Sequence, residues 1–338
     1  MLSRALEAKP RWSPNLRYGD NNSCKFGSIL EYSNQDCIVG FIDDLPLVFC
    51  GNFNTESSNL TLREVLRASV AVMGESRLGM TEKAVLLEGK IYAVKRFRKI
   101  SVGRREFGKR VEKLANISRN CNFVVPVSAY LYSKRIKFVL CDYYPMGSLA
   151  DLLSGGREFG HTALDWKQRL KIGLDIANAI SFIHTQSPHE KNMQINVHGN
   201  IKASNVLINT NFSACLSDYG FAQLAEFEEV SDTPENKQPK CGYSEEFSQK
   251  SDIYNFGIIL LDMLGGARAP NSVNCIIERK EEIKSGAIEF FEFAVQGKER
   301  LQALQILEIG LACKRKSPDA RPSIQHILKY FGDVIINK

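Results

Sequence analysis

Four groups of residues between positions 74 and 220 have the types and the spacing to do chemistry. In chain order they are the glycine-containing stretch Gly74 to Thr81, the alternating run Ile91 to Phe97, the loop His198 to Asn205 and the turn Asp218-Tyr219-Gly220. In the alternating run, a period of two puts Ala93 and Lys95 on one face of a strand. Asn205 and Asp218 supply amide and carboxylate oxygens, which are ligands for a hard cation such as Mg²⁺.

The elements that must position these groups differ between the two parts of the chain. Before Gly147 we expect a short helix at Leu60–Val70, a strand-turn-strand at Gly74–Glu88 with Gly74 and Gly79 at its bends, a strand at Ile91–Phe97, a helix at Arg104–Ile117, and strands at Val125–Tyr132 and Lys137–Tyr143. After it, helical periodicity predicts helices at Trp166–His184, Gln249–Leu264, Arg300–Cys313 and Pro322–Tyr330. A strand-rich part followed by a helix-rich part predicts two unlike lobes.

Composition restricts the class of protein. The net charge of +6 permits a nucleic-acid or acidic-membrane partner without demanding one. The first 20 residues have no continuous apolar stretch, and no run of about 18 apolar residues occurs anywhere, so neither a signal peptide nor a membrane span is expected. Nine cysteines without a Cys-x-x-Cys pair give little support to a zinc site, and suit a reducing compartment.

The order of the four groups resembles the signature set of the protein kinases. The closest resemblance is to the kinase domains of plant leucine-rich-repeat receptor-like kinases, in particular the inactive subgroup. Three phrases carry it: Tyr92 to Arg96, His198 to Asn205, and Gln249 to Gly257. The resemblance covers about residues 60 to 331 and implies an α+β, bilobal kinase-like fold. Its first lobe is an antiparallel sheet with one helix, and its second lobe is mainly helical.

The resemblance also implies a domain organisation. Residues 1–59 are an N-terminal extension, partly irregular, in which Ile38–Phe41 and Leu45–Phe49 are candidate short strands. Residues 60–331 are the kinase-like domain, with an N-lobe at about 60–144 and a C-lobe at about 145–331. Residues 332–338 form a C-terminal tail.

The resemblance further implies ATP and Mg²⁺ as ligands, bound weakly or not at all. The nucleotide-binding positions are Gly74, Ser76, Gly79, Thr81, Ala93, Lys95, Asp142, Tyr144 and Leu207, with Cys141 as gatekeeper and Asp142-Tyr143-Tyr144 as hinge. Lys95 corresponds to the lysine that grips the phosphates. Ser76 replaces a glycine, and Glu75 adds negative charge beside the expected phosphates. Asn205 and Asp218 match the metal ligands.

At the catalytic positions, Lys202 matches a phosphate contact, but Asn200 stands where kinases have the aspartate that accepts the substrate's hydroxyl proton. An amide has no useful basicity, so no efficient phosphoryl transfer is expected. Gly199 replaces the neighbouring arginine. Arg110 stands where a glutamate would pair with Lys95, and we expect Arg110 to point to solvent.

Scaffold positions are better kept than chemical ones. By resemblance, Asp252 braces the catalytic loop, and Leu114, His198 and Tyr219 stack in a column between the lobes. Thr233-Pro234-Glu235 matches the end of the activation segment, which leaves a short, acidic loop, and Glu235 is expected to pair with Arg321. A basic patch from Lys95 to Lys113 is either a solvated helix face or a contact for anionic lipid or an acidic partner.

Three functions remain open from the sequence. The chain is a pseudokinase that serves as a signalling scaffold or allosteric partner of receptor-like kinases, a weakly active Ser/Thr kinase, or a nucleotide-free interaction module. Its expected partners are other protein kinases or receptor-like kinases, with peripheral membrane contact and no nucleic acid. Its expected place is the cytoplasm, including the cytosolic face of the plasma membrane.

Overall fold

The computed structural model describes residues 47–50, 60–158, 164–187, 193–225, 247–265 and 273–336. These ranges all belong to one compact unit, Val39–Lys338. The predictions for residues 1–46, which include the candidate strand Ile38–Phe41, and for the end of the activation segment lie outside the described residues. Within the described part, no helix is both long and apolar enough to cross a membrane.

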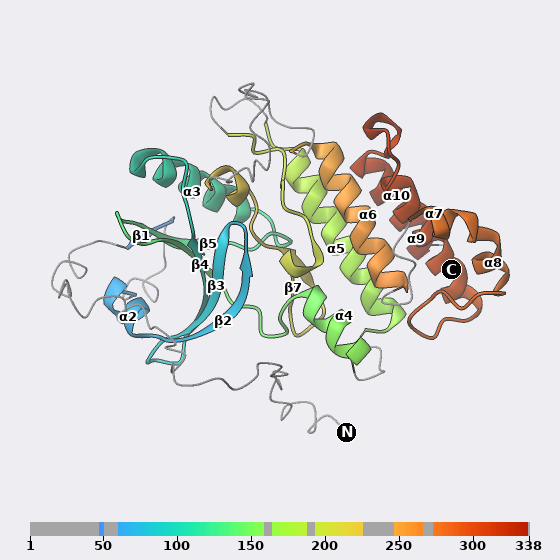
Figure 1. Cartoon of the computed structure of the whole chain (residues 1–338), viewed down its shortest axis with the longest axis horizontal. Coiled ribbons are helices and arrows are strands. Elements are labelled where there is room, and N and C mark those ends of the chain that lie inside the picture. The colour runs from blue at the N-terminus through green and yellow to red at the C-terminus, as the bar shows by residue number, and fades with distance from the viewer. Residues whose placement is uncertain are drawn as a thin grey trace, which may run out of the picture. The chain divides into compact units, whose positions relative to one another are not determined.

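The first lobe is a six-stranded antiparallel sheet (Figure 1). Its strands are β1 (Val48–Phe49), β2 (Ser69–Ser76), β3 (Gly79–Val85), β4 (Ile91–Phe97), β5 (Val127–Tyr132) and β6 (Lys137–Asp142). Their order in the sheet is β1-β5-β6-β4-β3-β2. The predicted strand at Ile91–Phe97 is confirmed, and it pairs with strands on both sides.

Two helices accompany the sheet. The helix α2 (Leu62–Arg67) begins at a capping box, in which the Thr61 hydroxyl accepts a hydrogen bond from the Glu64 backbone and the Glu64 carboxylate accepts one from Thr61. The longer helix α3 (Arg104–Ser118) confirms the predicted helix within one residue. Its predicted apolar side, Phe107, Val111, Leu114 and Ile117, is buried.

The second lobe is mainly helical, as predicted. It contains α4 (Leu149–Glu158), α5 (Trp166–His184), α6 (Gln249–Gly265), α7 (Val273–Glu278), α8 (Lys280–Ser285), α9 (Gly297–Cys313), α10 (Ile324–Ile336) and a two-stranded sheet of β7 (Val206–Ile208) and β8 (Ala214–Leu216). Helices α5 and α6 pack against each other, with α9 on α6 and α10 on α5 (Figure 1). Fully buried Phe256 and Phe331 meet in this core with ring centroids 6.5 Å apart.

Several predicted boundaries are wrong in detail. Helix α2 ends before Val70, which lies in β2, and α10 runs to Ile336, into the predicted tail. The strand-turn-strand begins at Ser69 rather than Gly74, so Gly74 lies inside β2 at a shift of register and not at a bend. The chain reverses after Ser76, between β2 and β3.

Gly79 opens β3 and does lie at the bend. Its φ of +144° is a conformation that side chains with a Cβ rarely adopt. A Cβ at this position would lie 1.9 Å from the backbone oxygen of Arg96 in the adjacent strand β4. Glycine therefore lets the hairpin press directly onto β4, the strand that carries Lys95.

Candidate functional site

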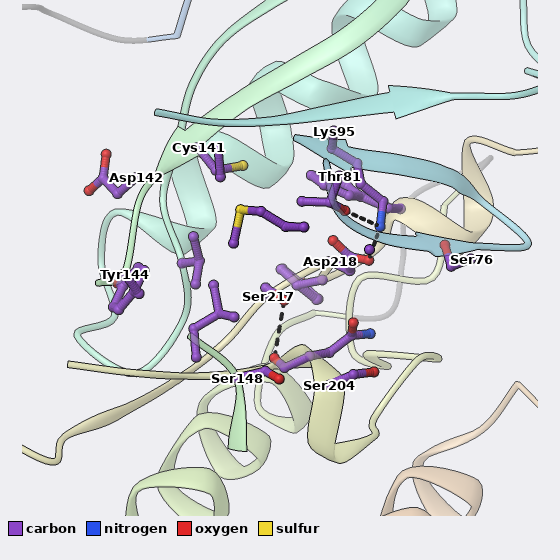
Figure 2. A pocket seen from close by; sticks show the side chains of 18 of the residues that line it. Ser76, Thr81, Lys95, Cys141, Asp142, Tyr144, Ser148, Ser204, Ser217 and Asp218 are labelled. Carbon is purple, nitrogen blue, oxygen red and sulfur yellow. Dashed lines mark hydrogen bonds and ion pairs between the residues drawn. The ribbon is translucent and has the colours of Figure 1, made fainter. Parts of the chain in front are cut away.

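A cleft inside this unit collects most of the residues that the sequence singled out (Figure 2). It encloses about 1080 Å³ of space, part of it open to solvent. The residues singled out by the sequence that line it are Gly74, Glu75, Ser76, Thr81, Ala93, Lys95, Leu114, Cys141, Asp142, Tyr143, Tyr144, Lys202, Asn205, Leu207, Asp218 and Tyr219. Gly79 and Asn200 are not among its lining residues. The β strands thus supply one wall, the segment after β6 a second, and the loops around β7 and β8 the floor.

The charged centre of the cleft is an ion pair between the two lobes. The Lys95 Nζ lies 2.7 Å from Asp218 Oδ2, and it also donates to the Thr81 hydroxyl at 3.1 Å (Figure 2). Lys95 is only 6% exposed. Asp218 takes a left-handed backbone conformation, with φ +64°, which turns its carboxylate toward Lys95. Thr81 was expected only as a nucleotide-binding position, and its role as a partner of Lys95 was missed.

Asp252 of α6 fixes the loop that precedes the cleft, as predicted. Its two carboxylate oxygens accept hydrogen bonds from the backbone N–H groups of His198 and Gly199, at 2.8 and 3.0 Å. His184, at the end of α5, adds a third contact at 3.0 Å. Because Asp252 is fully buried, these bonds replace the water that its charge has lost.

Asn200 is held through its backbone. Its N–H donates to His198 Nδ1 at 3.2 Å, and its carbonyl accepts from the Asn205 side chain at 2.8 Å. Its side-chain nitrogen is buried without a hydrogen-bond partner in the described part of the chain. The loop therefore keeps its shape, while the side chain at this position offers an amide where a proton acceptor is needed.

The candidate metal ligands sit close to this loop. Asn205 donates through its side-chain nitrogen, which leaves the amide oxygen for a cation. Ser217, between Asn205 and Asp218 in the fold, bonds to the Asn205 carbonyl through both its N–H and its hydroxyl. Lys202 reaches the same cleft. Burial lowers the pKa of its ammonium group, and the nearby Asp218 opposes this shift.

Arg110 does not point to solvent, so that prediction is wrong. Its side chain is 15% exposed, and its Nη1 donates to the backbone carbonyl of Gln223 at 2.9 Å. Its Nε donates to Glu106 one turn earlier in α3, at 2.8 Å. The arginine therefore faces inward, as the glutamate of a kinase would, but it bonds to the backbone after the Asp218-Tyr219-Gly220 turn instead of Lys95.

Gln223 was missed by the sequence reasoning. It ends the 3-10 helix Phe221–Gln223, and its side-chain amide exchanges two hydrogen bonds with the backbone of Gln194, at 2.7 and 3.0 Å. Gln223 therefore contacts Arg110 of α3 through its backbone carbonyl and Gln194 through its side chain. The neighbouring Leu224 carbonyl accepts a bond from the Ser101 N–H at 3.1 Å. No periodicity or motif marks such a residue in advance.

Two side chains of the predicted phosphate loop, those of Glu75 and Ser76, are engaged by neighbouring residues. Glu75 forms an exposed ion pair with Arg98 of the chain after β4, so its charge is shared. The Ser76 hydroxyl donates to the Gly79 carbonyl at 3.3 Å, across the turn. The serine therefore closes the hairpin, where a glycine would leave the backbone free.

The residues predicted to stack between the lobes lie near one another, and the predicted gatekeeper Cys141 lies in the cleft wall. The rings of His198 and Tyr219 are 6.1 Å apart, and Leu114 lies within 2.5 Å of where a Cβ on Gly220 would be. Burial lowers the pKa of His198 and raises that of Tyr219, whose hydroxyl donates to the Ile195 carbonyl. Burial likewise raises the pKa of the Cys141 thiol in the cleft wall.

The predicted pair of Glu235 and Arg321 cannot be compared, because Thr233-Pro234-Glu235 lies outside the described residues. Within them, the Arg321 guanidinium donates to three backbone carbonyls, those of Lys250, Arg315 and Lys316. The arginine therefore joins the start of α6 to the chain before α10.

Comparison with known proteins gives the family. The family model of protein tyrosine and serine/threonine kinases matches residues 70–331. A probable inactive receptor kinase of Arabidopsis thaliana is 34% identical over an alignment of 341 positions, gaps included, which covers 97% of this chain and 50% of the relative. The chain spans about half the length of the curated relatives it matches.

Two solved structures share the fold. The pseudokinase domain of BIR2, an immune regulator of the RLK/Pelle family, superposes with a TM-score of 0.69 at 24% identity, over 88% of this chain and 91% of that one. The kinase domain of maize SIRK1, a sucrose-induced receptor kinase solved with AMP-PNP, superposes with a TM-score of 0.67 at 26% identity, over 86% of this chain and 99% of that one. These matches confirm the resemblance to plant receptor-like kinases, and the chain belongs to the protein kinase family.

Proposed function

We propose that this chain is a pseudokinase domain of the receptor-like kinase type, which keeps the cleft of a kinase but transfers no phosphoryl group efficiently. The observation that carries the proposal is the state of Asn200. Its loop is braced by Asp252, yet its side chain is an amide whose nitrogen has no hydrogen-bond partner among the described residues. Loss of a general base costs about a hundred- to ten-thousandfold in rate. The relative named a probable inactive receptor kinase supports the same conclusion.

The cleft fits a nucleotide in part. Lys95 and Lys202 both line it, so they bring two cations to the place where phosphates would lie. The amide oxygen of Asn205 and the carboxylate of Asp218 would hold Mg²⁺, whose charge would offset that of the phosphates. Against binding, the Lys95 ammonium is already engaged by Asp218 and Thr81. A nucleotide must therefore compete with these contacts, and we propose weak rather than tight binding.

We further propose that the domain acts as a scaffold or allosteric partner of other receptor-like kinases at the cytosolic face of the plasma membrane. The support is structural. Arg110, Gln223 and Asp252 bond α3, the turn after Asp218 and the catalytic loop to their neighbours. A domain held in one arrangement presents a constant surface to a partner.

A phosphotransfer assay tests the loss of chemistry. The full chain, Mg²⁺ and radiolabelled ATP are incubated with casein, beside an active receptor kinase domain as positive control. We expect no incorporation above the Asp218→Asn variant. Incorporation that disappears in Asp218→Asn would instead establish a weak Ser/Thr kinase, because Asp218 and Asn205 would then be placing a working metal.

A thermal shift tests the cleft separately. A ligand at a hundred times its dissociation constant stabilises by about 2.7 kcal/mol. We expect Mg²⁺-ATP at millimolar concentration to raise the melting temperature, and Asp218→Asn to remove most of the rise. No shift at any concentration would identify the chain as a nucleotide-free interaction module.

A further inference from the structure

A second hollow lies between α3 and the strands β1 and β5, and we call it the α3 groove. It encloses about 680 Å³, part of it open to solvent. It is lined by Val48 of β1, by Arg104, Arg105, Gly108, Lys109 and Glu112 of α3, and by Tyr130, Leu131 and Tyr132 of β5. Nothing in the proposed function uses this hollow.

The α3 groove has an apolar floor and a cationic rim. Tyr130 and Leu131 are 7% and 3% exposed, and Val48 pairs with Tyr130 across the strands. A Cβ on Gly108 would lie 2.6 Å from the Tyr130 hydroxyl, so glycine allows α3 to approach the floor closely. Arg104, Arg105 and Lys109 stand on the rim and are exposed.

Unlike Arg110 and Glu112, these three cations form no hydrogen bond or ion pair in the part of the chain that the structure describes. Arg110 takes Glu106, and the carboxylate of Glu112 accepts a hydrogen bond from Tyr130 at 2.9 Å. The carboxylates of α3 are therefore engaged, whereas Arg104, Arg105 and Lys109 make no hydrogen bond or ion pair with described residues. Arg104 and Arg105 also begin the helix, where its dipole disfavours cations. An anion in the groove would reduce the repulsion among the three cations and would offset their unfavourable interaction with the helix dipole.

We propose that the α3 groove binds a phosphorylated segment of a partner protein, with a phosphoserine or phosphothreonine at the rim and a flanking aromatic or branched side chain on the floor. A phosphate group brings nearly two negative charges and three acceptor oxygens, and arginine forks match that geometry. The flanking apolar side chain packs against the half-buried Val48. A flat lipid surface would meet the exposed cations but would leave the concave floor unfilled, which favours a side-chain ligand.

Fluorescence anisotropy with a defined probe tests this site. The probe is a fluorescein-labelled peptide, Glu-Phe-Phe-phosphothreonine-Phe-Glu, and the comparison is the same peptide without phosphate. The full chain is expected to bind the phosphopeptide about tenfold or more tightly than the unphosphorylated peptide, because charge-assisted hydrogen bonds are the strong ones. The triple variant Arg104→Ala, Arg105→Ala, Lys109→Ala is expected to lose at least that factor.

Two further variants keep the test specific. A control triple, Lys167→Ala, Lys298→Ala, Lys316→Ala, removes the same charge from exposed positions outside the groove and is expected to change binding less than about twofold. The variant Val48→Glu leaves the cations in place but puts a carboxylate on the floor, and it is expected to abolish the preference for phosphate. Melting curves check that each variant is folded.

Three results would overturn the proposal. They are no phosphopeptide binding by the unaltered chain, an equal loss in the control triple, and binding to phosphatidylserine vesicles that the groove variant weakens while the phosphopeptide stays unbound. The last would assign the cations to a membrane surface. None of these results depends on nucleotide binding or phosphotransfer, so the proposed function can stand or fall separately.

Discussion

Replacing Arg110 by alanine should destabilise the domain far more than its place on the surface of a helix would indicate. The guanidinium gives one hydrogen bond to the Gln223 carbonyl and one to Glu106. A hydrogen bond from a charged donor is worth about 1.5–3 kcal/mol. The Glu106 pair is partly exposed and adds only about 0.3–0.5 kcal/mol. We therefore expect Arg110→Ala to lower the free energy of unfolding by about 2–3 kcal/mol.

The matched control is Glu106→Ala, which removes the partly exposed partner and leaves the bond to Gln223. It should cost no more than about 0.5 kcal/mol. Urea denaturation followed by intrinsic fluorescence gives both values on the full chain. If the two variants lose equal free energy of unfolding, the hydrogen bond from Arg110 to the Gln223 carbonyl contributes no measurable stability, and the reasoning is refuted.

A double-mutant cycle sharpens the same test. Gln223→Ala removes the two bonds to Gln194 that hold the turn beneath Arg110. Once the turn is released, Arg110 has less to hold, so the double variant should lose less than the sum of the two single losses. Residues that act independently add within about 0.3–0.5 kcal/mol. Additivity within that range would show that Arg110 and Gln223 do not act as one connection.

Three other perturbations have outcomes fixed by local geometry. Gly79→Ala should cost several kcal/mol in urea denaturation because its φ is +144° and a Cβ would meet backbone at 1.9 Å, whereas Gly74→Ala, with open space around it, should cost about 1 kcal/mol or less. Burial lowers the pKa of His198 below its unfolded value of about 6.5, so near that pH the folded state binds fewer protons than the unfolded state. The free energy of unfolding should therefore fall as the pH drops below about 6.5, by up to about 1.4 kcal/mol per pH unit. The variant His198→Asn should show a smaller fall in melting curves taken from pH 7.5 to 5. Gly199→Arg should lower the melting temperature, because a Cβ there would lie 1.9 Å from the Phe247 ring, and adding Phe247→Ala should recover part of the loss; a melting temperature unchanged by Gly199→Arg would refute the contact.

The sequence predicted best the elements whose signals are local. Helix α5 begins where Asp165 and Gln168 form a capping box, and its boundaries match the prediction to the residue. Strand β4 was equally clear, because two of its residues, Ala93 and Lys95, belong to a known motif. The kinase motifs likewise predicted which residues line the cleft, since their spacing is tied to the fold.

The sequence could not predict which group each of these side chains bonds to. Arg110 was expected to face solvent because a cation cannot pair with Lys95, and the backbone carbonyl that accepts its hydrogen bond leaves no mark in a sequence. Gln223 was missed for the same reason. Thr81 bonds Lys95 only because β3 and β4 pair them directly across the sheet. Such contacts follow from tertiary register and not from residue type.

The short strand β1 sets a limit on how far the chain can be trimmed. It pairs with β5 at the edge of the sheet, and Cys50 extends the pairing through a bond to the Ser128 carbonyl. The family match begins only at residue 70. A fragment cut there would lose buried Leu47 and Cys50 and leave the N–H and C=O groups of β5 unpaired, an open template for other strands. Such a fragment should self-associate, so its behaviour in solution would report on the cut rather than on the domain.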